Sequence, residues 1–411
     1  MDNCIILAIE SSCDETAISI LKSSGSSMEL LCNEVSSQVK LHAKWGGVVP
    51  NLAAREHVKN ITPLLDLSLK NAGLTSKEID VIAVTEGPGL IPALMVGVNF
   101  AKTLSYLWEK PLIGIHHIEG HIYANFIQIK NQESGIKNQG HDSKFMTHDS
   151  QDIKFPALVL VVSGGHTQLV LMKDHLKYEI IGQTLDDAVG EAFDKVARIL
   201  GIGYPGGPNV AAWAAKYQNP NVKCQIKSKC QNKRNISDQL LVTSDNNLNK
   251  NISTSFGIEF PRPMIHKKNF NFSFSGLKTA VLYETKKLKE KLRVTDYELL
   301  IPEICHEFQQ ASIDVLISKT IKAAEQYCPK TIMLAGGVSA NKELRKQLGA
   351  AIRESLPPTA YHLPPLELTG DNAAMIAAAA AFRWSKMSEM QKKKAMNNWE
   401  NLQPDANLKL K

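Results

Sequence analysis

The chain has 411 residues, of which 44% are hydrophobic and 21% are charged, and its formal net charge is +6. This composition is typical of a globular protein, and the length predicts two domains rather than one. The longest apolar stretches, Pro156–Val162 and Ala373–Phe382, fall well short of the roughly 20 residues that a membrane-spanning helix needs. The N-terminus enters a strand directly, without an Arg-rich or apolar leader, so we expect a cytoplasmic protein that is not attached to a membrane.

The cysteines argue against disulfide or zinc–thiolate chemistry. There are seven of them, an odd number, and no two have the C-x-x-C spacing. This pattern favours reduced thiols. Cys13 lies in the first polar turn, where we interpret it as a small turn residue rather than a nucleophile.

Two apolar hairpins with polar turns begin the two halves of the chain. In the first, two apolar runs flank the polar turn 10–16. In the second, the strand 155–162 leads to Ser163-Gly164-Gly165 and then to the apolar run 168–172. Glycine reaches positive φ cheaply, so this turn is expected to bring backbone N–H groups onto a phosphate, with an ordinary hairpin turn as the alternative. The repeat indicates an internal duplication with the ligand between the halves.

Two further strands also end in glycine turns. The strand 79–84 precedes Gly87-Pro88-Gly89, and the strand 331–335 precedes Gly336-Gly337 and a helix that begins at Lys342. Glycine turns at the ends of several buried strands favour a nucleotide site. The sequence has neither the motif G-x-x-x-x-G-K-[ST] nor a helix-opening G-x-G-x-x-G, which excludes the P-loop and Rossmann classes.

Several segments have the apolar spacing of helices. They include residues 52–69 and 92–107. A helix over 185–200 is expected to be capped by Thr184. Its polar side, which includes Asp194, is either an ordinary solvated face or a place to hold the hydroxyls of a ribose.

One pair of histidines has the spacing of metal ligands. His117 and His121 are four residues apart, so one face of a helix presents both imidazoles to a single ion. The protease motif H-E-x-x-H is not met, because the glutamate is at Glu119 and the general base is then misplaced. Two such histidines are more often fortuitous unless a third ligand exists. Asp371, just before an alanine-rich helix, is a candidate third ligand, with helix capping as its ordinary role.

Positive charge is concentrated in one part of the sequence. Residues 218–255 hold six basic and two acidic residues, and residues 265–293 hold eight basic and two acidic ones. A basic zone on a mildly acidic body predicts that a polyanion docks there. Phe270, Phe272 and Phe274 alternate with polar residues within this zone. We interpret them as the buried face of a strand, and base stacking is the alternative.

Three segments have a composition that is unfavourable for a packed core. Residues 131–155 are rich in Asn, Gln, Lys and His, and residues 218–255 are rich in Asn, Lys and Ser, so we expect low-complexity surface inserts there. Residues 391–411 form a polar tail that we expect to be frayed.

Several short motifs together are far more specific than any one of them. They are Ile9–Thr16, Trp45–Pro50, Glu86–Leu90, His117–His121, Val162–Thr167, Gly190–Lys195, Tyr204–Pro208, Phe260–Pro263, Ser273–Thr279, Ala335–Val338 and Thr369–Asn372. This set resembles the TsaD family of tRNA N6-adenosine threonylcarbamoyltransferases, formerly described as glycoproteases. The resemblance covers about residues 4–130, 156–217 and 256–384.

The resemblance implies an α/β fold of the actin/Hsp70/sugar-kinase (ASKHA) type, in which two duplicated RNase H-like lobes surround a nucleotide cleft. Residues 1–130 and about 370–390 would form the N-terminal lobe, and residues 156–369 the C-terminal lobe. The implied reaction transfers the threonylcarbamoyl group from L-threonylcarbamoyladenylate to N6 of adenosine-37, giving t6A and AMP. The implied tRNAs read codons that start with A. Besides tRNA and the adenylate, the implied partners are helper subunits similar to TsaB and TsaE.

The resemblance also assigns residues. His117, His121 and Asp371 would bind one divalent metal per subunit, with Fe2+ expected first and Zn2+ second. Asp14 and Glu15 lie in the acidic turn that such enzymes need for activity, which makes them the catalytic candidates. The substrate-binding candidates are Val161, Val162, Ser163, Gly164, Gly165, Asp194, Gly207 and Asn341.

A sugar kinase or ATPase of the same fold is the alternative function. Such an enzyme does not require the histidine pair as metal ligands. A metalloprotease is less favoured because Glu119 is misplaced, and a non-catalytic scaffold would have little need of the metal set and the glycine turns together.

Overall fold

The computed structural model describes residues 3–24, 27–127, 153–218, 257–292 and 297–410. The expected inserts at 131–155 and 218–255 lie almost wholly outside these residues. Among the described helices, none is both long enough and apolar enough to span a bilayer.

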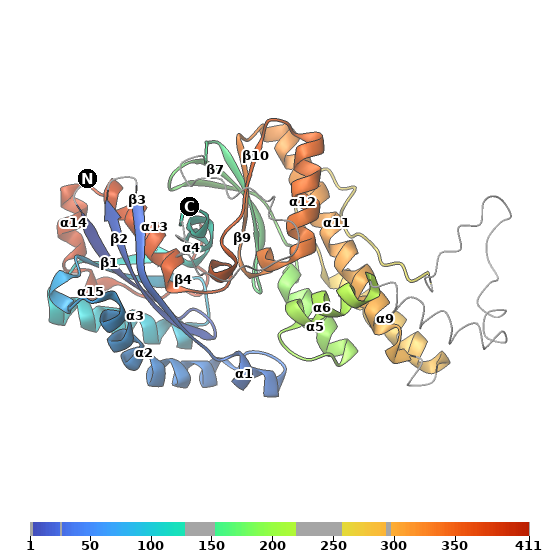
Figure 1. The fold of residues 1–411 in the computed structure, drawn as a ribbon, viewed down its shortest axis with the longest axis horizontal. Coiled ribbons are helices and arrows are strands. Elements are labelled where there is room, and N and C mark those ends of the chain that lie inside the picture. The colour runs from blue at the N-terminus through green and yellow to red at the C-terminus, as the bar shows by residue number, and fades with distance from the viewer. Residues whose placement is uncertain (1–2, 25–26, 128–152, 219–256, 293–296, 411) are drawn as a thin grey trace, which may run out of the picture.

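Two five-stranded sheets with the same topology form the centres of two lobes (Figure 1). The first sheet contains β1 (Cys4–Glu10), β2 (Glu15–Ser24), β3 (Ser27–Ser37), β4 (Val81–Gly87) and β5 (Leu112–His116) in the order β3-β2-β1-β4-β5. The second contains β6 (Ala157–Val162), β7 (Thr167–Asp174), β8 (Lys177–Gln183), β9 (Thr331–Ala335) and β10 (Ala360–His362) in the order β10-β9-β6-β7-β8. In each sheet, the first three strands form an antiparallel meander and the last two run parallel to the first strand. The expected two-lobed, duplicated α/β fold is confirmed.

Helices cover both faces of each sheet. The outer layer of the first lobe is α2 (Pro50–Ala72) with α3 (Ile91–Trp108). The central layer, between the sheets, is α4 (His117–Tyr123) with α13 (Ala373–Lys386). The outer helices of the second lobe are α5 (Val189–Leu200), α6 (Gly206–Gln218), α9 (Ser275–Lys291), α11 (Ile301–Tyr327) and α12 (Lys342–Ser355).

The central strands are apolar on both faces because each face meets a helical layer. In β6, Leu158 and Leu160 point into the core shared with α5 and α11. Val159 and Val161 point the other way, into the core shared with α4 and α13. The alanine-rich start of α13, with every residue from Ala373 to Ala381 no more than 5% exposed, lets this helix fit between the two sheets.

Helix α5 begins later than the sequence predicted. We expected Thr184 to cap a helix from Leu185, but α5 starts at Val189. Thr184 instead forms a bridge with Phe272, and its hydroxyl donates to the carbonyl of Asp187, 2.8 Å away. This pairing keeps the chain extended and leaves the Leu185 side chain 62% exposed.

The alternating phenylalanines belong to the core. Phe272 and Phe274 are 0% exposed and Phe270 is 9% exposed. They pack in the same hydrophobic cluster as α5 and α11. Their burial is confirmed and base stacking by these three rings is wrong, but the expected strand is absent from this described segment, since only Phe272 forms an isolated bridge.

The C-terminal segment is folded rather than frayed, contrary to expectation. After α13 the chain forms α14 (Glu389–Ala395) and α15 (Asn398–Asn401). Leu402 is then only 7% exposed and packs in the core of the first lobe. Farther along, the Asp405 N–H donates to the Glu86 carbonyl at 2.8 Å. A few apolar side chains and backbone hydrogen bonds therefore anchor a segment whose composition is mainly polar.

We expect Leu402→Ala to lower the free energy of unfolding by about 2–4 kcal/mol, because it removes a buried side chain and leaves a cavity. Thermal unfolding followed by circular dichroism measures the change. Leu107→Ala is the matched control, since Leu107 is 65% exposed on the same lobe and surface changes of this kind cost within about 0.5 kcal/mol. Equal midpoints for the two variants would show that the C-terminal segment is not anchored.

Candidate active site

The carboxyl ends of the central strands of both sheets provide the site. In the first lobe, β1 ends at Glu10, and β5 leads directly into α4 through His116 and His117. In the second lobe, β6 ends at the Ser163 turn. Loops at the carboxyl ends of parallel strands are where open α/β sheets bind ligands.

Three side chains from two elements of the central layer meet at one point. His117 and His121 are at the two ends of one short stretch of α4, and Asp371 immediately precedes the cap of α13. Asp371 Oδ1 lies 3.2 Å from His121 Nε2 and 3.6 Å from His117 Nε2. One ligand atom from each residue can be chosen so that all lie within 4.8 Å of one another.

These donors fit a transition-metal ion. Metal–nitrogen bonds of about 2.0–2.1 Å at tetrahedral angles place ligand atoms roughly 3.3 Å apart, close to the separations found here. In addition, Nδ1 of the buried His121 has no hydrogen-bond partner among the described residues, and its Nε2 meets only Asp371, in a contact without hydrogen-bond geometry. A buried polar atom without such a bond is costly, and an ion would satisfy it. Imidazole with carboxylate suits zinc and iron alike.

Glu10 orients His117 and was not identified from the sequence. Its Oε2 is 3.1 Å from His117 Nδ1 and accepts a hydrogen bond of 2.6 Å from Thr85 Oγ1. The side chain is 0% exposed. A carboxylate that binds the second imidazole nitrogen fixes the orientation of the ring, which would leave Nε2 free to bind an ion. The available signal was a charged residue at the end of an otherwise apolar strand.

Glu119 braces the two helices. It is 1% exposed, and both of its oxygens lie 2.9 Å from Nη2 of Arg383 on α13. This ion pair joins α4 to α13. Both carboxylate oxygens of Glu119 are therefore paired with Arg383. This is consistent with the sequence argument that Glu119 is not the general base of a protease.

The charges of the cluster are strongly coupled. Burial would lower the pKa of His117, but the charges of Asp371 and Glu10 outweigh burial and raise that pKa to about 9. Burial would raise the pKa of Asp371, but the nearby histidines hold it far below its usual value. Without an ion, a protonated His117 therefore lies between two carboxylates. The site carries the charge pattern that a cation requires.

The acidic turn joins β1 to β2. Asp14 is 7% exposed, and its carbonyl accepts a hydrogen bond of 3.0 Å from the Gln38 N–H. Glu15 accepts a hydrogen bond of 2.9 Å from the Ser37 hydroxyl. Burial, the charge of Asp14 and the charge of Asp371 raise the pKa of Glu15 to about 9. The Glu15 carboxyl group therefore holds its proton at neutral pH.

The Ser163 turn presents open backbone. A Cβ atom built on Gly164 or Gly165 would meet nothing within 4 Å. Neither glycine has a positive φ, so the expectation that this turn depends on positive φ was wrong. The turn is closed instead by hydrogen bonds between Ser163 and His166, including Ser163 N to His166 O at 2.8 Å. A Cβ on Gly190 would lie 2.5 Å from the Ser163 carbonyl, so the start of α5 packs directly against this turn.

Asp194 holds the start of α6. Its Oδ1 accepts a hydrogen bond of 2.7 Å from the Gly206 N–H. A Cβ on Gly206 would lie 2.4 Å from the Asp194 Cα, so only glycine permits this approach. Burial raises the pKa of Asp194. The neighbouring Gly207 has open space where a side chain would be.

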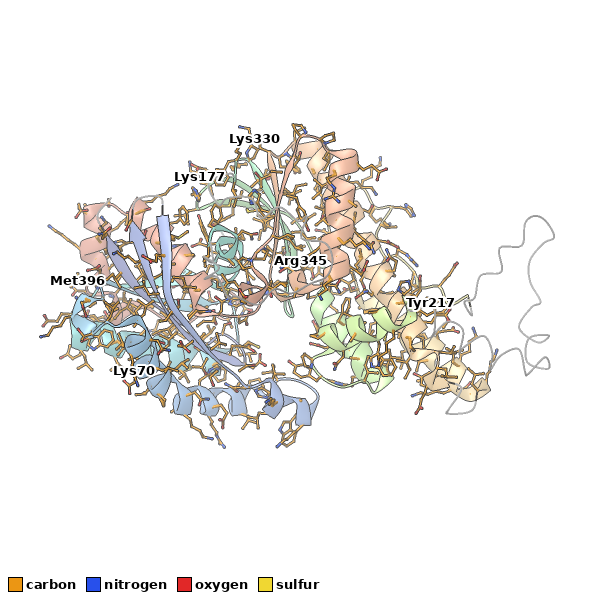
Figure 2. All side chains as sticks on the ribbon, in the orientation of Figure 1. Lys70, Lys177, Tyr217, Lys330, Arg345 and Met396 are labelled. Atoms are coloured by element: carbon orange, nitrogen blue, oxygen red, sulfur yellow. The ribbon has the colours of Figure 1, made fainter. Side chains whose placement is uncertain are left out.

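The other substrate candidates have their side chains engaged elsewhere. Asn341 caps α12 by accepting from the Leu344 N–H at 3.0 Å, and its amide donates to Gln309. Arg345 (Figure 2) secures the same loop by donating to the Ser339 carbonyl. Val161 and Val162 are 0% exposed within β6. The two valines can therefore offer a ligand only backbone atoms.

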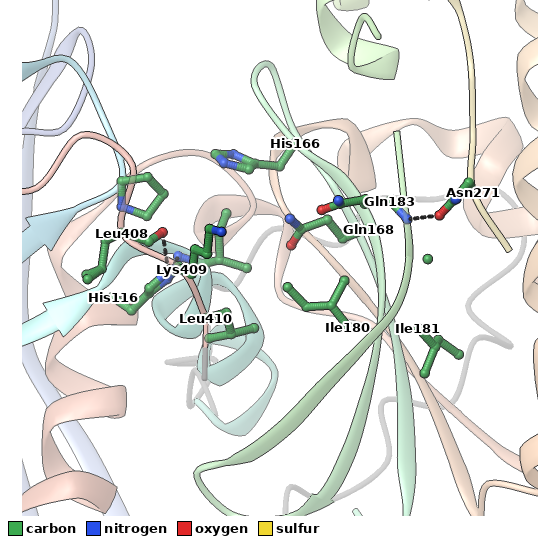
Figure 3. Close-up of a pocket in the computed structure, with 13 residues that line it drawn as sticks. His116, His166, Gln168, Ile180, Ile181, Gln183, Asn271, Leu408, Lys409 and Leu410 are labelled. Atoms are coloured by element: carbon green, nitrogen blue, oxygen red, sulfur yellow. Dashed lines mark hydrogen bonds between the residues drawn. The ribbon is translucent and has the colours of Figure 1, made fainter. Parts of the chain in front are cut away.

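A cavity of about 360 Å³ lies beside this site, between the two lobes (Figure 3). His116 and Ile118 line it from the first lobe, and His166 and Gln168 from the second. The C-terminal residues Leu408–Leu410 form another wall, and the Leu408 carbonyl is 3.1 Å from His116 Nε2. The glycines of the Ser163 turn do not line this cavity, so we do not place a phosphate there.

We expect purified protein to bind one divalent metal ion per chain and His117→Ala or His121→Ala to lose it. Glu10→Gln should keep the site but weaken its affinity about 10- to 100-fold, the usual effect of removing such an outer carboxylate. Metal analysis and chelator competition measure both effects. His266→Ala is the control, because His266 is exposed and remote from the cluster. Retention of a full equivalent of metal by both alanine variants would show that the ion binds elsewhere.

The family model and the curated relatives point to the same family. The family model for TsaD, tRNA N6-adenosine threonylcarbamoyltransferase, matches residues 29–136, 139–237 and 236–378. The tRNA N6-adenosine threonylcarbamoyltransferase of Listeria monocytogenes serotype 4b (strain CLIP80459) is 43% identical over 92% of this chain and 90% of its own length. The enzyme of that name from Bacillus subtilis (strain 168) is 42% identical over 93% and 91%.

Two solved structures are similar to this chain at low sequence identity. The T. kodakarensis HypF structure has a TM-score of 0.47 at 10% identity, with 93% of this chain and 47% of that chain covered. YeaZ from Pseudomonas aeruginosa has a TM-score of 0.26 at 11% identity, with 43% and 63% covered. The sequence matches, which span nearly the whole chain, show that the protein belongs to the TsaD family.

Proposed function

We propose that this chain transfers the threonylcarbamoyl group from L-threonylcarbamoyladenylate to N6 of adenosine-37 in tRNA, in the cytoplasm. The observation that carries the proposal is the match to tRNA N6-adenosine threonylcarbamoyltransferases over nearly the whole length. The meeting of His117, His121 and Asp371 beside an acidic turn supports it. The kinase or ATPase alternative is not favoured by any of these findings.

The reaction exchanges one acyl bond for another. The N6 amine attacks the carbamoyl carbon, the new N–C bond forms, and the bond from that carbon to the phosphate oxygen breaks to release AMP. A proton leaves the amine. Because an exocyclic adenine amine is a poor nucleophile, positioning should contribute more than a strong base.

The glycine turns suit the adenylate. Gly164 and Gly165 offer accessible backbone at the start of α5, where helix N–H groups favour a phosphate. The Asp194 carboxylate, which extends from α5 to the start of α6, and the open Gly207 suit the ribose. In this proposal Ser163 and Asn341 shape the turns, and Val161 and Val162 contribute backbone only.

His117, His121 and Asp371 would hold the metal, which we propose to be Fe2+, with Zn2+ as the second choice. The chemistry that a bound cation supplies is Lewis-acid polarisation of oxygens on the adenylate. Glu10 would hold the His117 ring in the orientation that this role requires.

Asp14 is the better candidate for accepting the proton from the amine. Glu15, whose pKa is raised to about 9, holds a proton at neutral pH and cannot take another. Asp14 lies beside it on the same turn. Glu15 would then act as a hydrogen-bond donor or a support for the turn.

The test of the function is direct. Purified protein, given threonylcarbamoyladenylate, unmodified tRNA and TsaB- and TsaE-like helper subunits, should form t6A and AMP in equal amounts. Mass spectrometry of digested tRNA measures the product. Absence of the modified nucleoside with all components present would refute the proposal.

We expect Asp14→Asn to lower kcat by about 10²- to 10⁴-fold, the range for loss of a general base. Glu15→Gln preserves a neutral group and should lower kcat by less than about tenfold. Single-turnover t6A formation measures the chemical step, and metal content checks that both variants keep the ion. The reverse order of the two effects would assign the base to Glu15.

Helix α9 supplies the docking surface that we propose for the tRNA backbone. Lys286, Lys287 and Lys289 are exposed on it. Charge reversal at all three should weaken tRNA binding and reduce the slope of log K against log salt by about 2–3. Reversal of Lys393 and Lys394, exposed on α14 of the other lobe, is the control. Unchanged affinity and slope after the α9 changes would remove this helix from the docking surface.

A further inference from the structure

An exposed tryptophan lies on the loop that faces the second lobe from the first. Trp45 ends the 3-10 helix η1 (Ala43–Trp45), which follows α1 (Val39–His42), and its side chain is 69% exposed. Lys40 and Lys44 are exposed beside it. The mechanism above gives these residues no role.

Buried polar side chains hold this loop in place. His42 is 0% exposed, and its Nδ1 accepts from the Val49 N–H at 3.3 Å, so its proton is on Nε2 and is donated to Gln38 Oε1 at 3.1 Å. His57, also 0% exposed, lies 2.8 Å from Thr16 Oγ1 through Nδ1 and 3.1 Å from the Cys13 carbonyl through Nε2. Fully bonded buried networks of this kind rigidify a structure.

The same network joins the loop to the acidic turn. The Gln38 N–H donates to the Asp14 carbonyl at 3.0 Å, and the adjacent Ser37 hydroxyl donates to Glu15. The position of Trp45 is therefore tied to that of the proposed base.

The loop also contacts the second lobe. Arg198 on α5 donates through Nη2 to the Gly46 carbonyl, directly after Trp45. Arg198 is one helical turn beyond Asp194. Figure 1 shows α1 beside the α5–α6 end of the second lobe. Trp45 thus lies where the two lobes meet at the edge of the proposed nucleotide site.

The chemistry of this surface suits single-stranded RNA. A lone aromatic ring with two exposed lysines on the same short segment supplies stacking for one base and charge for neighbouring phosphates. Protein interfaces, in contrast, are depleted of lysine at their centres. A base that reacts must also leave its stack, and an aromatic surface nearby compensates for the lost stacking.

We propose that Trp45, with Lys40 and Lys44, forms a stacking platform for a base of the single-stranded loop of the tRNA substrate, next to the acidic turn. This inference rests on the proposed function, and it identifies the part of the tRNA that Trp45 would contact. Trp45 would act as a positioning residue: it would hold the tRNA loop in place while other groups perform the transfer.

The test compares two RNA probes on the full-length chain: an anticodon stem–loop and the same stem as a blunt duplex. We expect Trp45→Ala to weaken stem–loop binding by about 5- to 100-fold, the range for loss of one stacked base, and to leave duplex binding unchanged. Trp45→Phe should restore most of the affinity. Tyr106→Ala is the matched control, because Tyr106 is 60% exposed on the same lobe. In turnover, Trp45→Ala should raise KM for tRNA while KM for the adenylate stays the same.

Three outcomes would overturn the proposal. The first is equal stem–loop affinity in wild type and Trp45→Ala. The second is a loss that Trp45→Phe does not restore, which would indicate a structural defect. The third is loss of helper-subunit binding with unchanged RNA affinity, which would make this a protein-docking surface. Failure of the wild-type chain to form t6A would refute the proposed function instead, because the binding comparison needs no turnover.

Discussion

The close approach of α4 to α13 is the constraint on which the site depends. Helix α4 carries the two histidines and Asp371 immediately precedes the cap of α13, so the three side chains meet only if the two helices nearly touch. Gly120 makes this possible, since a Cβ atom there would lie 2.7 Å from Ile376 Cδ1 and 3.1 Å from Met375 Cγ. The ion pair between Glu119 and Arg383 also joins these two helices. The motif residues between the two histidines thus set the helix spacing that brings Asp371 within reach.

The duplicated topology explains how one cleft acquires two kinds of chemistry. The β1–β2 turn and the β6–β7 turn occupy equivalent positions in the two sheets. The first is acidic and lies near the metal cluster, whereas the second is glycine-rich and offers open backbone. In the proposed reaction, the first lobe would supply the acidic groups and the second lobe would supply the backbone that binds the adenylate. The adenylate would then contact both lobes, and the hydrogen bond from Arg198 to the Gly46 carbonyl is one contact that joins them.

Local patterns predicted the parts of the structure that local physics decides. Apolar runs located the central strands, and glycine turns located their carboxyl ends. The start of α5 could not be predicted, because the pairing of Thr184 with Phe272 is a contact between distant segments. The order in the C-terminal segment was missed for the same reason: its hydrogen bonds go to Glu86 and His116, far away in the sequence. Glu10 was missed because its role appears only when His117 is placed beside it.

The buried charges of the metal cluster set a further condition on its chemistry. Two carboxylates, Glu10 and Asp371, face His117, and buried charges persist only when they are paired. In the absence of an ion, protonation of His117 provides that pairing, which is why its pKa is raised. Since Glu10 occupies Nδ1, a cation must compete with the proton at Nε2. The same carboxylates that would attract a metal ion therefore also hold the proton that opposes it, and we expect occupancy of the proposed site to rise with pH until His117 is deprotonated.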